Sequence, residues 1–165
     1  MFKKKNTDEK EILNSIKECS LFSELADKEL KELNRIIHVR DYSQGERVFS
    51  EGTMGLCFYL VVKGTVQIVS QNSGELNVIK EYTKGAYFSE IHLFSETRHT
   101  VSCVTKEITK LIVLSKPDFE SLMKIKPIIA NKILARFLEF FGMQLDKLYL
   151  ENIELRKKAG KNIPA

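Results

Sequence analysis

A stretch over residues 85–100 carries the residue types best suited to binding a small anion. Arg98 offers a guanidinium, whose paired N–H donors match phosphate oxygens, and Glu90 offers a carboxylate that can accept hydrogen bonds from hydroxyl groups. A helical turn is expected over 89–94 with Ser89 as its N-cap, and the free backbone N–H groups at its start would favour an anion. These residues predict a cradle for a phosphate joined to a sugar. A surface ion pair between Glu90 and Arg98 is the alternative.

Short β-rich runs punctuated by glycines surround this stretch, which is typical of a small antiparallel sandwich or barrel. Strand character begins at Ile36 and continues in runs at 47–50, 57–62, 66–70, 76–82, 100–104 and 108–114. The turns between them are expected at Gly45, Gly52, Gly64, 72–74 and Gly85, where glycine tolerates positive φ.

Helices are expected at both ends of the chain. Apolar residues at three- and four-residue spacing predict a helix over 8–18, and Asp27 is a suitable N-cap for a second one. After the last strand, Asp118 is expected to cap a short helix, and Pro127 fits the first turn of a long one.

The sequence therefore predicts one mainly β domain over 1–165, an antiparallel β-roll with flanking helices. The expected parts are N-terminal helices (1–35), the β-roll (36–115), C-terminal helices (116–158) and a tail (159–165).

Composition excludes several classes of protein. The 165 residues are 43% hydrophobic with a net charge of +4, which fits one globular domain and falls short of a dedicated nucleic-acid binder. Three widely spaced cysteines argue against a disulfide framework or a zinc site, and buried, inert thiols are expected at Cys19, Cys57 and Cys103. No apolar run is long enough for a membrane span, and no secretory signal is visible, so a cytoplasmic location is expected.

Catalytic chemistry is not expected. The three histidines, at positions 38, 92 and 99, form no His-x-His pair, so no metal site is expected. The chain has neither a Gly-x-Ser-x-Gly turn nor a phosphate loop ending in Gly-Lys-Ser/Thr, and no cofactor is expected.

The long helix carries a heptad seam. Apolar residues alternate four and three apart, with Asn152 as a lone polar residue at an a position, which is typical of a parallel two-stranded coiled coil. The predicted homodimer seam is Leu134, Leu138, Phe141, Leu145, Leu148, Asn152 and Leu155. The alternative is that this face packs on the chain's own roll, although Phe137, Phe140 and Met143 lie off the seam and could dock there instead.

The order of elements and the spaced glycines resemble the cyclic nucleotide-binding domain family over about 21–147. The resemblance rests on Tyr42-x-x-Gly45-Glu46, Glu51-Gly52, Phe58-Tyr59-Leu60-Val61, Lys63-Gly64-Thr65-Val66, Gly85-x-x-Phe88-x-Glu90-Ile91 and Arg98-x-Thr100. By this resemblance the chain is a sensor of cAMP or cGMP, with a β-roll closed by its last helix.

The resemblance also implies roles for particular residues. Glu90 would bind the ribose 2′-hydroxyl and Arg98 the cyclic phosphate, with Ser89 and either Thr100 or His99 completing the phosphate shell. Contacts to the base are expected from Tyr82, Gln144 and Leu145.

The chain departs from the family pattern in three ways. Ser89 replaces a glycine, His99 replaces a small residue, and the loop between Glu90 and Arg98 is one residue shorter. Two functions therefore remain open: a ligand-sensing module that moves its final helix and acts through a separate effector protein, or a degenerate module that serves as a dimeric interaction unit. Direct DNA binding is not expected, because no stretch for a helix-turn-helix follows the long helix.

Overall fold

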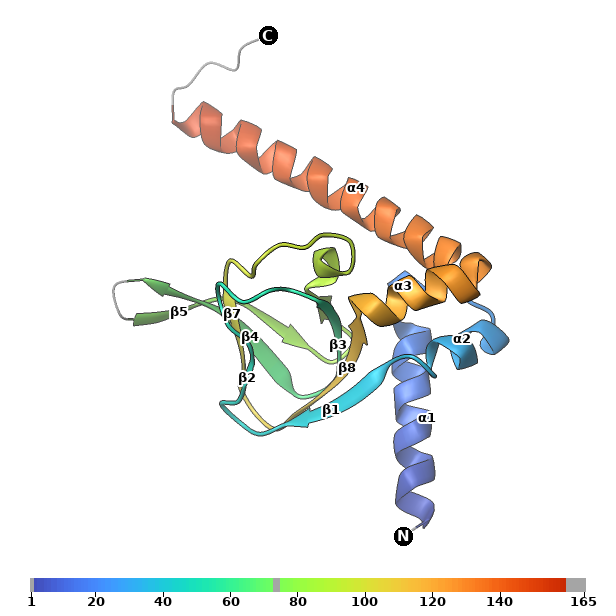
Figure 1. Cartoon of the computed structure of the whole chain (residues 1–165). Coiled ribbons are helices and arrows are strands. Elements are labelled where there is room, and N and C mark those ends of the chain that lie inside the picture. Colours follow the sequence, from blue (N-terminus) through green and yellow to red (C-terminus); the bar gives the residue numbers. More distant parts are fainter. Residues whose placement is uncertain (1, 73–74, 160–165) are drawn as a thin grey trace.

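The computed structural model describes residues 2–72 and 75–159. Over these residues, eight strands form a β-roll, and most of the helices pack outside one of its sheets (Figure 1). The elements in chain order are α1 (Phe2–Glu18), η1 (Ser20–Phe22), α2 (Asp27–Leu33), β1 (His38–Tyr42), β2 (Arg47–Phe49), β3 (Cys57–Lys63), β4 (Thr65–Asn72), β5 (Glu75–Thr83), β6 (Tyr87–Phe88), η2 (Glu90–Leu93), β7 (Ser102–Thr105), β8 (Thr109–Ser115), α3 (Lys116–Ile125) and α4 (Pro127–Lys158).

The strands form two four-stranded sheets in which every pairing is antiparallel. One sheet has the order β1-β8-β3-β6 and the other the order β2-β7-β4-β5. The register pairs Phe58 with Leu114 in the first sheet and Gln67 with Val104 in the second. The predicted fold class, an antiparallel β-roll with N-terminal helices and a long C-terminal helix, is confirmed.

Strand β3 divides the hydrophobic core into two clusters, because its alternate side chains point to opposite faces of the sheet. Phe58, Leu60 and Val62 face the helices, whereas Tyr59 and Val61 face the inside of the roll. The strand is therefore buried on both faces, and it connects the helical layer with the interior of the roll.

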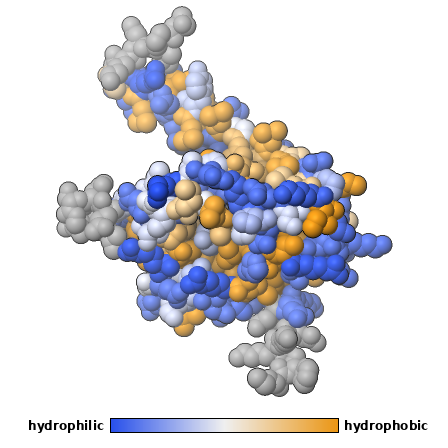
Figure 2. All heavy atoms as spheres, in the orientation of Figure 1, coloured by the Kyte–Doolittle hydropathy of each residue, from blue (hydrophilic) through white to orange (hydrophobic). Residues whose placement is uncertain are grey.

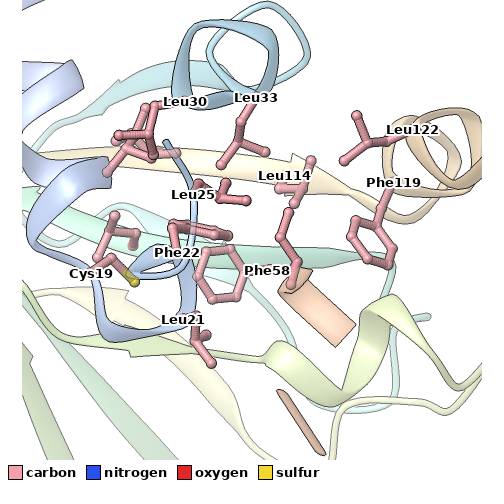
Figure 3. Packing of buried hydrophobic residues seen from close by; sticks show 14 of the residues in the cluster. Cys19, Leu21, Phe22, Leu25, Leu30, Leu33, Phe58, Leu114, Phe119 and Leu122 are labelled. Carbon is pink, nitrogen blue, oxygen red and sulfur yellow. The ribbon is translucent and has the colours of Figure 1, made fainter. Parts of the chain in front are cut away.

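The cluster on the helical side is the larger one, and it joins the two ends of the chain. Phe22 of η1 meets Phe58 edge to face at 5.9 Å, and Phe137 of α4 meets the same ring at 6.1 Å. Figure 3 shows residues of α2, α3 and the strands converging on this cluster. The packing fixes the start of α4 against the roll.

Two of the predicted helix caps are wrong. Helix α2 begins after Ala26, whose N–H donates to the Glu29 carboxylate at 2.8 Å, so Asp27 lies in the first turn. Ser115 caps α3 by accepting a hydrogen bond from the Asp118 N–H at 3.2 Å, so Asp118 also lies inside its helix. In both cases, the capping group belongs to a neighbour of the expected residue.

The glycine turns are confirmed at four positions. Gly45, Gly52, Gly64 and Gly85 all have positive φ. The expected turn at 72–74 and the tail at 159–165 lie largely outside the described residues. Strand β6 was not predicted: with two residues, it is too short to show a periodic pattern.

Candidate functional site

The helical turn expected over 89–94 is the 3₁₀ helix η2, visible as the yellow-green turn below α4 in Figure 1. Ser89 precedes it with a φ of 65°, in the left-handed region, and its side chain makes no capping hydrogen bond. The prediction that Ser89 caps the turn through its side chain is therefore wrong. Its hydroxyl is buried, and no described residue forms a hydrogen bond with it. A buried polar atom without a partner is rare in proteins and calls for an explanation.

A cavity of about 160 Å³ lies between the sheets and η2. The structure brings four of the predicted site residues into its wall, namely Tyr82, Ser89, His99 and Thr100. The rest of the wall was not predicted as part of a site, and it consists of Phe49, Ile68, Phe88, His92 and Val101. Four of them lie on or beside a strand and His92 lies in η2, so they share no signal in the sequence.

Two histidine rings form one side of this cavity. The His99 ring stacks on the Phe49 ring at 3.7 Å with an angle of 6° between the planes, and it meets the His92 ring edge-on at 4.3 Å. Burial lowers the pKa of both imidazoles, and the nearby His92 helps to lower the pKa of His99 to about 4. Both rings are therefore neutral at neutral pH.

His92 is held in place from two sides. Its ring packs directly on the backbone of Gly55, where any Cβ would collide with it. Its Nδ1 lies 3.3 Å from the Thr97 hydroxyl. His92 was not predicted as a binding residue, but its position makes it part of the cavity wall.

Arg98 lies at the surface and is not among the residues that line the cavity. Its Nη1 donates to the Gly52 carbonyl oxygen at 2.6 Å. No Glu90–Arg98 ion pair forms, so the alternative of a surface pair between them is not seen among the described residues.

Glu90 begins η2 and is partly buried. Burial raises the pKa of its carboxyl group, while a hydrogen bond from its own backbone and the charge of Lys80 act in the opposite direction. Lys80 also lies over the Tyr82 ring, with its Nζ 4.6 Å from the ring centroid. Glu90 is not among the residues that line the cavity, although Lys80 is close both to its carboxyl group and to the ring of the wall residue Tyr82.

A second hollow, on the other side of η2, is almost wholly apolar. It has a volume of about 240 Å³ and is lined by Ile91, Phe94, Leu134, Phe137, Leu138 and Phe141. Gln144 and Leu145, predicted to contact the base, are exposed on α4 and line neither hollow.

The predicted seam of α4 divides into two parts. Leu134 and Phe141 are partly buried and pack against the chain's own core. Leu138, Leu145, Leu148 and Leu155 are 60–75% exposed, and Asn152 is exposed as well. Figure 2 shows hydrophobic residues along α4, which extends away from the roll. Of the residues off the seam that were expected to dock on the roll, Phe137 is buried in the core, whereas Met143 is exposed.

The cysteines and histidines form no other site. Cys19 and Cys103 are buried, and burial raises the pKa of Cys19 to about 11 and of Cys103 to about 12, as expected of inert thiols. Cys57, also expected to be buried, is only partly so. The described residues contain no group of three or more side chains that could hold a metal ion. Within that part of the chain, no helix is long and apolar enough to cross a membrane.

The sequence matches a family model at residues 39–126, and that family is the cyclic nucleotide-binding domain. A cyclic AMP receptor protein from Thermus thermophilus is 30% identical over 145 residues, covering 86% of this chain and 67% of the relative. A cAMP-dependent protein kinase regulatory subunit from Mycosarcoma maydis is 25% identical over 108 residues, covering 62% of this chain but only 21% of that subunit. The chain thus spans two thirds of the first relative and about a fifth of the second.

Solved structures agree on the fold. A cyclic nucleotide-binding domain from Methylobacillus flagellatus superimposes with a TM-score of 0.73 at 22% identity, covering 88% of this chain and 82% of that one. The catabolite activator protein of Thermus thermophilus gives a TM-score of 0.63 at 30% identity, covering 80% of this chain and 64% of that one.

Proposed function

Because the chain belongs to the cyclic nucleotide-binding domain family, whose model matches more than half of it, we propose that it is a regulatory module that binds cAMP or cGMP in the cavity beside η2. The family members it resembles are regulatory proteins, and a receptor for cyclic AMP is among them.

The Ser89 hydroxyl is the observation that carries this proposal. Ser89 lines the cavity, and its hydroxyl is buried and has no hydrogen-bond partner among the described residues. Burying a hydroxyl without a partner costs roughly 1–3 kcal/mol. A ligand oxygen that reached this hydroxyl would supply the missing partner.

The other groups fit an anionic, hydroxylated ring compound. Glu90 is partly buried and can accept a hydrogen bond from a ribose hydroxyl, and the Tyr82 ring offers an aromatic face to the base. The anion would be met from the 97–100 loop, which carries Arg98 outside the cavity and His99 within it.

The second candidate is a module of the same family that no longer binds nucleotide. The stacked Phe49 and His99 rings favour it, because they fill part of the cavity and leave about 160 Å³. Ligand pockets are commonly about 300–1,000 Å³, so the cavity would have to enlarge to admit a nucleotide.

Calorimetric titration with cAMP and cGMP tests the proposal, with 5′-AMP as a control ligand. Binding should raise the melting temperature, since a ligand at 100 times its Kd stabilises a protein by about 2.7 kcal/mol. If millimolar cAMP and cGMP give neither heat nor a change in melting temperature, the proposal is wrong and the module that no longer binds nucleotide is favoured.

A matched pair of carboxylates tests the role of Glu90. Glu90→Gln should weaken nucleotide binding by about tenfold or more, because a hydrogen bond to a charged group contributes about 1.5–3 kcal/mol. Glu96→Gln, in a mostly exposed residue that pairs with Lys116, should leave the affinity unchanged. Equal affinities for the two variants would remove Glu90 from the site.

For the output of the module, we propose a parallel homodimer formed by the exposed part of the seam and a separate effector protein. Leu145 and Leu148 are 68% and 60% exposed, and the lone Asn152 would fix the register. Sedimentation of Leu148→Lys should show a monomer with unchanged melting of the roll. A wild-type monomer at high concentration would rule out the dimer.

The absence of direct DNA binding remains a prediction, since one structural neighbour is a domain of a transcriptional regulator.

A further inference from the structure

The loop that carries Arg98 and His99 is paired with a second loop as a short antiparallel ladder. Thr97 O accepts the Gly55 N–H at 3.0 Å, and Thr53 O accepts the His99 N–H at 2.9 Å. The Gly52 N–H in turn donates to His99 O at 2.8 Å. Met54 and Arg98 form a bridge between these bonds. The backbone around Arg98 and His99 is thus held at several points.

Neighbouring side chains in such an extended segment point to opposite faces. His99 is only 6% exposed and stacks on Phe49 inside the cavity, whereas Arg98 is exposed and donates to the Gly52 carbonyl oxygen. Exchanging the two side chains would need a slip of one residue along the ladder, and the slip would break the hydrogen bonds just described. The inward position therefore belongs to His99.

The surroundings of His99 contain little charge. Phe49 of β2 is neutral, and the titratable group in contact with the His99 ring is His92 of η2. Tyr82 of β5 lies in the cavity wall with Lys80 over its ring, and Glu90 at the start of η2 directly follows the wall residue Ser89. Burial and His92 hold the pKa of His99 near 4 in the free protein. An anion that enters would instead favour the protonated ring.

From this arrangement, and resting on the function proposed above, we propose that an anionic ligand of the cavity is held by the imidazolium of His99 rather than by Arg98, so that binding takes up one proton and strengthens as the pH falls.

The direction follows from linkage between proton and ligand. The ligand prefers protonated His99, so the His99 pKa rises when the ligand is bound, and affinity increases as the pH drops from the bound pKa towards the free pKa of about 4. The steepest dependence for one proton is about tenfold in Kd per pH unit. Between about pH 7.5 and about pH 5.5, a gain of roughly 10- to 100-fold is expected.

Calorimetry on the full chain tests this with cAMP, cGMP and sulfate, an anion whose charge is constant over this range. Wild type and Arg98→Gln should both bind more tightly at about pH 5.5 than at about pH 7.5, whereas His99→Gln should bind weakly at both. Histidine NMR of the wild-type chain gives the same answer without a substitution: the His99 pKa should rise on addition of ligand, and its ring signals should lose the shift caused by Phe49.

The outcomes separate the two proposals. Nucleotide binding that is independent of pH and is lost in Arg98→Gln overturns the role of His99 and leaves the nucleotide function standing. Proton-linked sulfate binding through His99, with no binding of cAMP or cGMP, supports the anion site and removes the nucleotide function. A His99 pKa that changes with neither sulfate nor nucleotide overturns the role of His99.

Discussion

The two hollows on either side of η2 differ in polarity and in the groups that line them, although consecutive residues of η2 face them. His92 faces the cavity between the sheets, and Ile91 faces the groove under α4. The cavity is lined by two imidazoles and by Ser89, whose buried hydroxyl has no partner among the described residues, whereas six apolar side chains line the groove. One wall is thus able to bind polar groups and change its charge, and the other stabilises the position of a helix.

This difference shows how a ligand could affect α4. Phe94, which directly follows η2, contacts Phe137 at 4.9 Å and Phe141 at 6.1 Å, measured between ring centroids. A ligand that displaces η2 from the cavity side would therefore disturb the contacts that hold α4. It can do so only to the extent that it binds the two positions of η2 with different affinity.

The groove is expected to contribute most to stability. Phe137 is 1% exposed and touches the Phe58, Phe94 and Phe141 rings, so Phe137→Ala should lower the free energy of unfolding by about 3–5 kcal/mol. Leu138→Ala, in the same groove but 75% exposed, should cost under about 1 kcal/mol. Urea unfolding measures both, and similar losses would mean that the groove is not anchored by Phe137.

The buried histidines of the cavity should make the free energy of unfolding depend on pH. The folded pKa of His99, about 4, lies below its unfolded value of 6.5, so the unfolded chain binds more protons between these values. Stability is therefore full above about pH 6.5 and falls as the pH drops towards 4, by about 3 kcal/mol from His99 alone. The lowered pKa of His92 adds a loss of the same sign.

Comparing wild type with His99→Phe isolates this contribution, because the variant keeps a ring on Phe49 and cannot be protonated. Its melting temperature should fall less between about pH 7 and about pH 5 than that of wild type. If the melting temperatures of the two proteins fall equally with pH, His99 is not buried as a neutral ring.

Substitutions of Ser89 should have a smaller effect and should raise the stability of the free protein. Ser89→Gly removes both the left-handed strain and the buried hydroxyl, so it should stabilise the free protein by about 1–2 kcal/mol. Ser89→Ala keeps the backbone strain and should stabilise it less. If the hydroxyl binds the ligand, both variants should lose nucleotide affinity. A less stable Ser89→Gly would show that the hydroxyl already has a partner in the free protein.

The smallest change lies at the end of the groove. Gly142 lies within α4, its φ is not positive, and a Cβ added there would meet no other atom within 4 Å. Gly142→Ala should therefore stabilise the helix by about 0.5–1 kcal/mol. Thermal unfolding measures the shift. A loss of stability would indicate that another surface, such as a second copy, approaches the chain at Gly142.

The sequence predicted the fold well because its signals are local. Glycines with positive φ mark the turns of the roll, and apolar spacing identifies α1 and α4. Helix caps were less predictable, because Glu29 caps α2 from inside the helix, and because Ser115 and Asp118, near the start of α3, are both suitable N-cap types.

The site was predicted only in part, because motif spacing does not determine which way a side chain points. Tyr82, Ser89, His99 and Thr100 do meet at one cavity. The outward position of Arg98 and the His99–Phe49 stack depend on pairing between segments about fifty residues apart, which no local pattern reveals. Gln144 lines neither hollow, because α4 extends away from the roll in its later turns (Figure 1).

The most direct test of the proposed function is an NMR titration of the full chain with cAMP and cGMP that compares the two hollows. We expect the largest shifts at Ser89, His99 and Thr100, followed by smaller shifts at Phe94 and Phe137 as η2 moves. Spectra that stay unchanged at millimolar nucleotide, or shifts confined to the groove, would contradict a nucleotide site in the cavity.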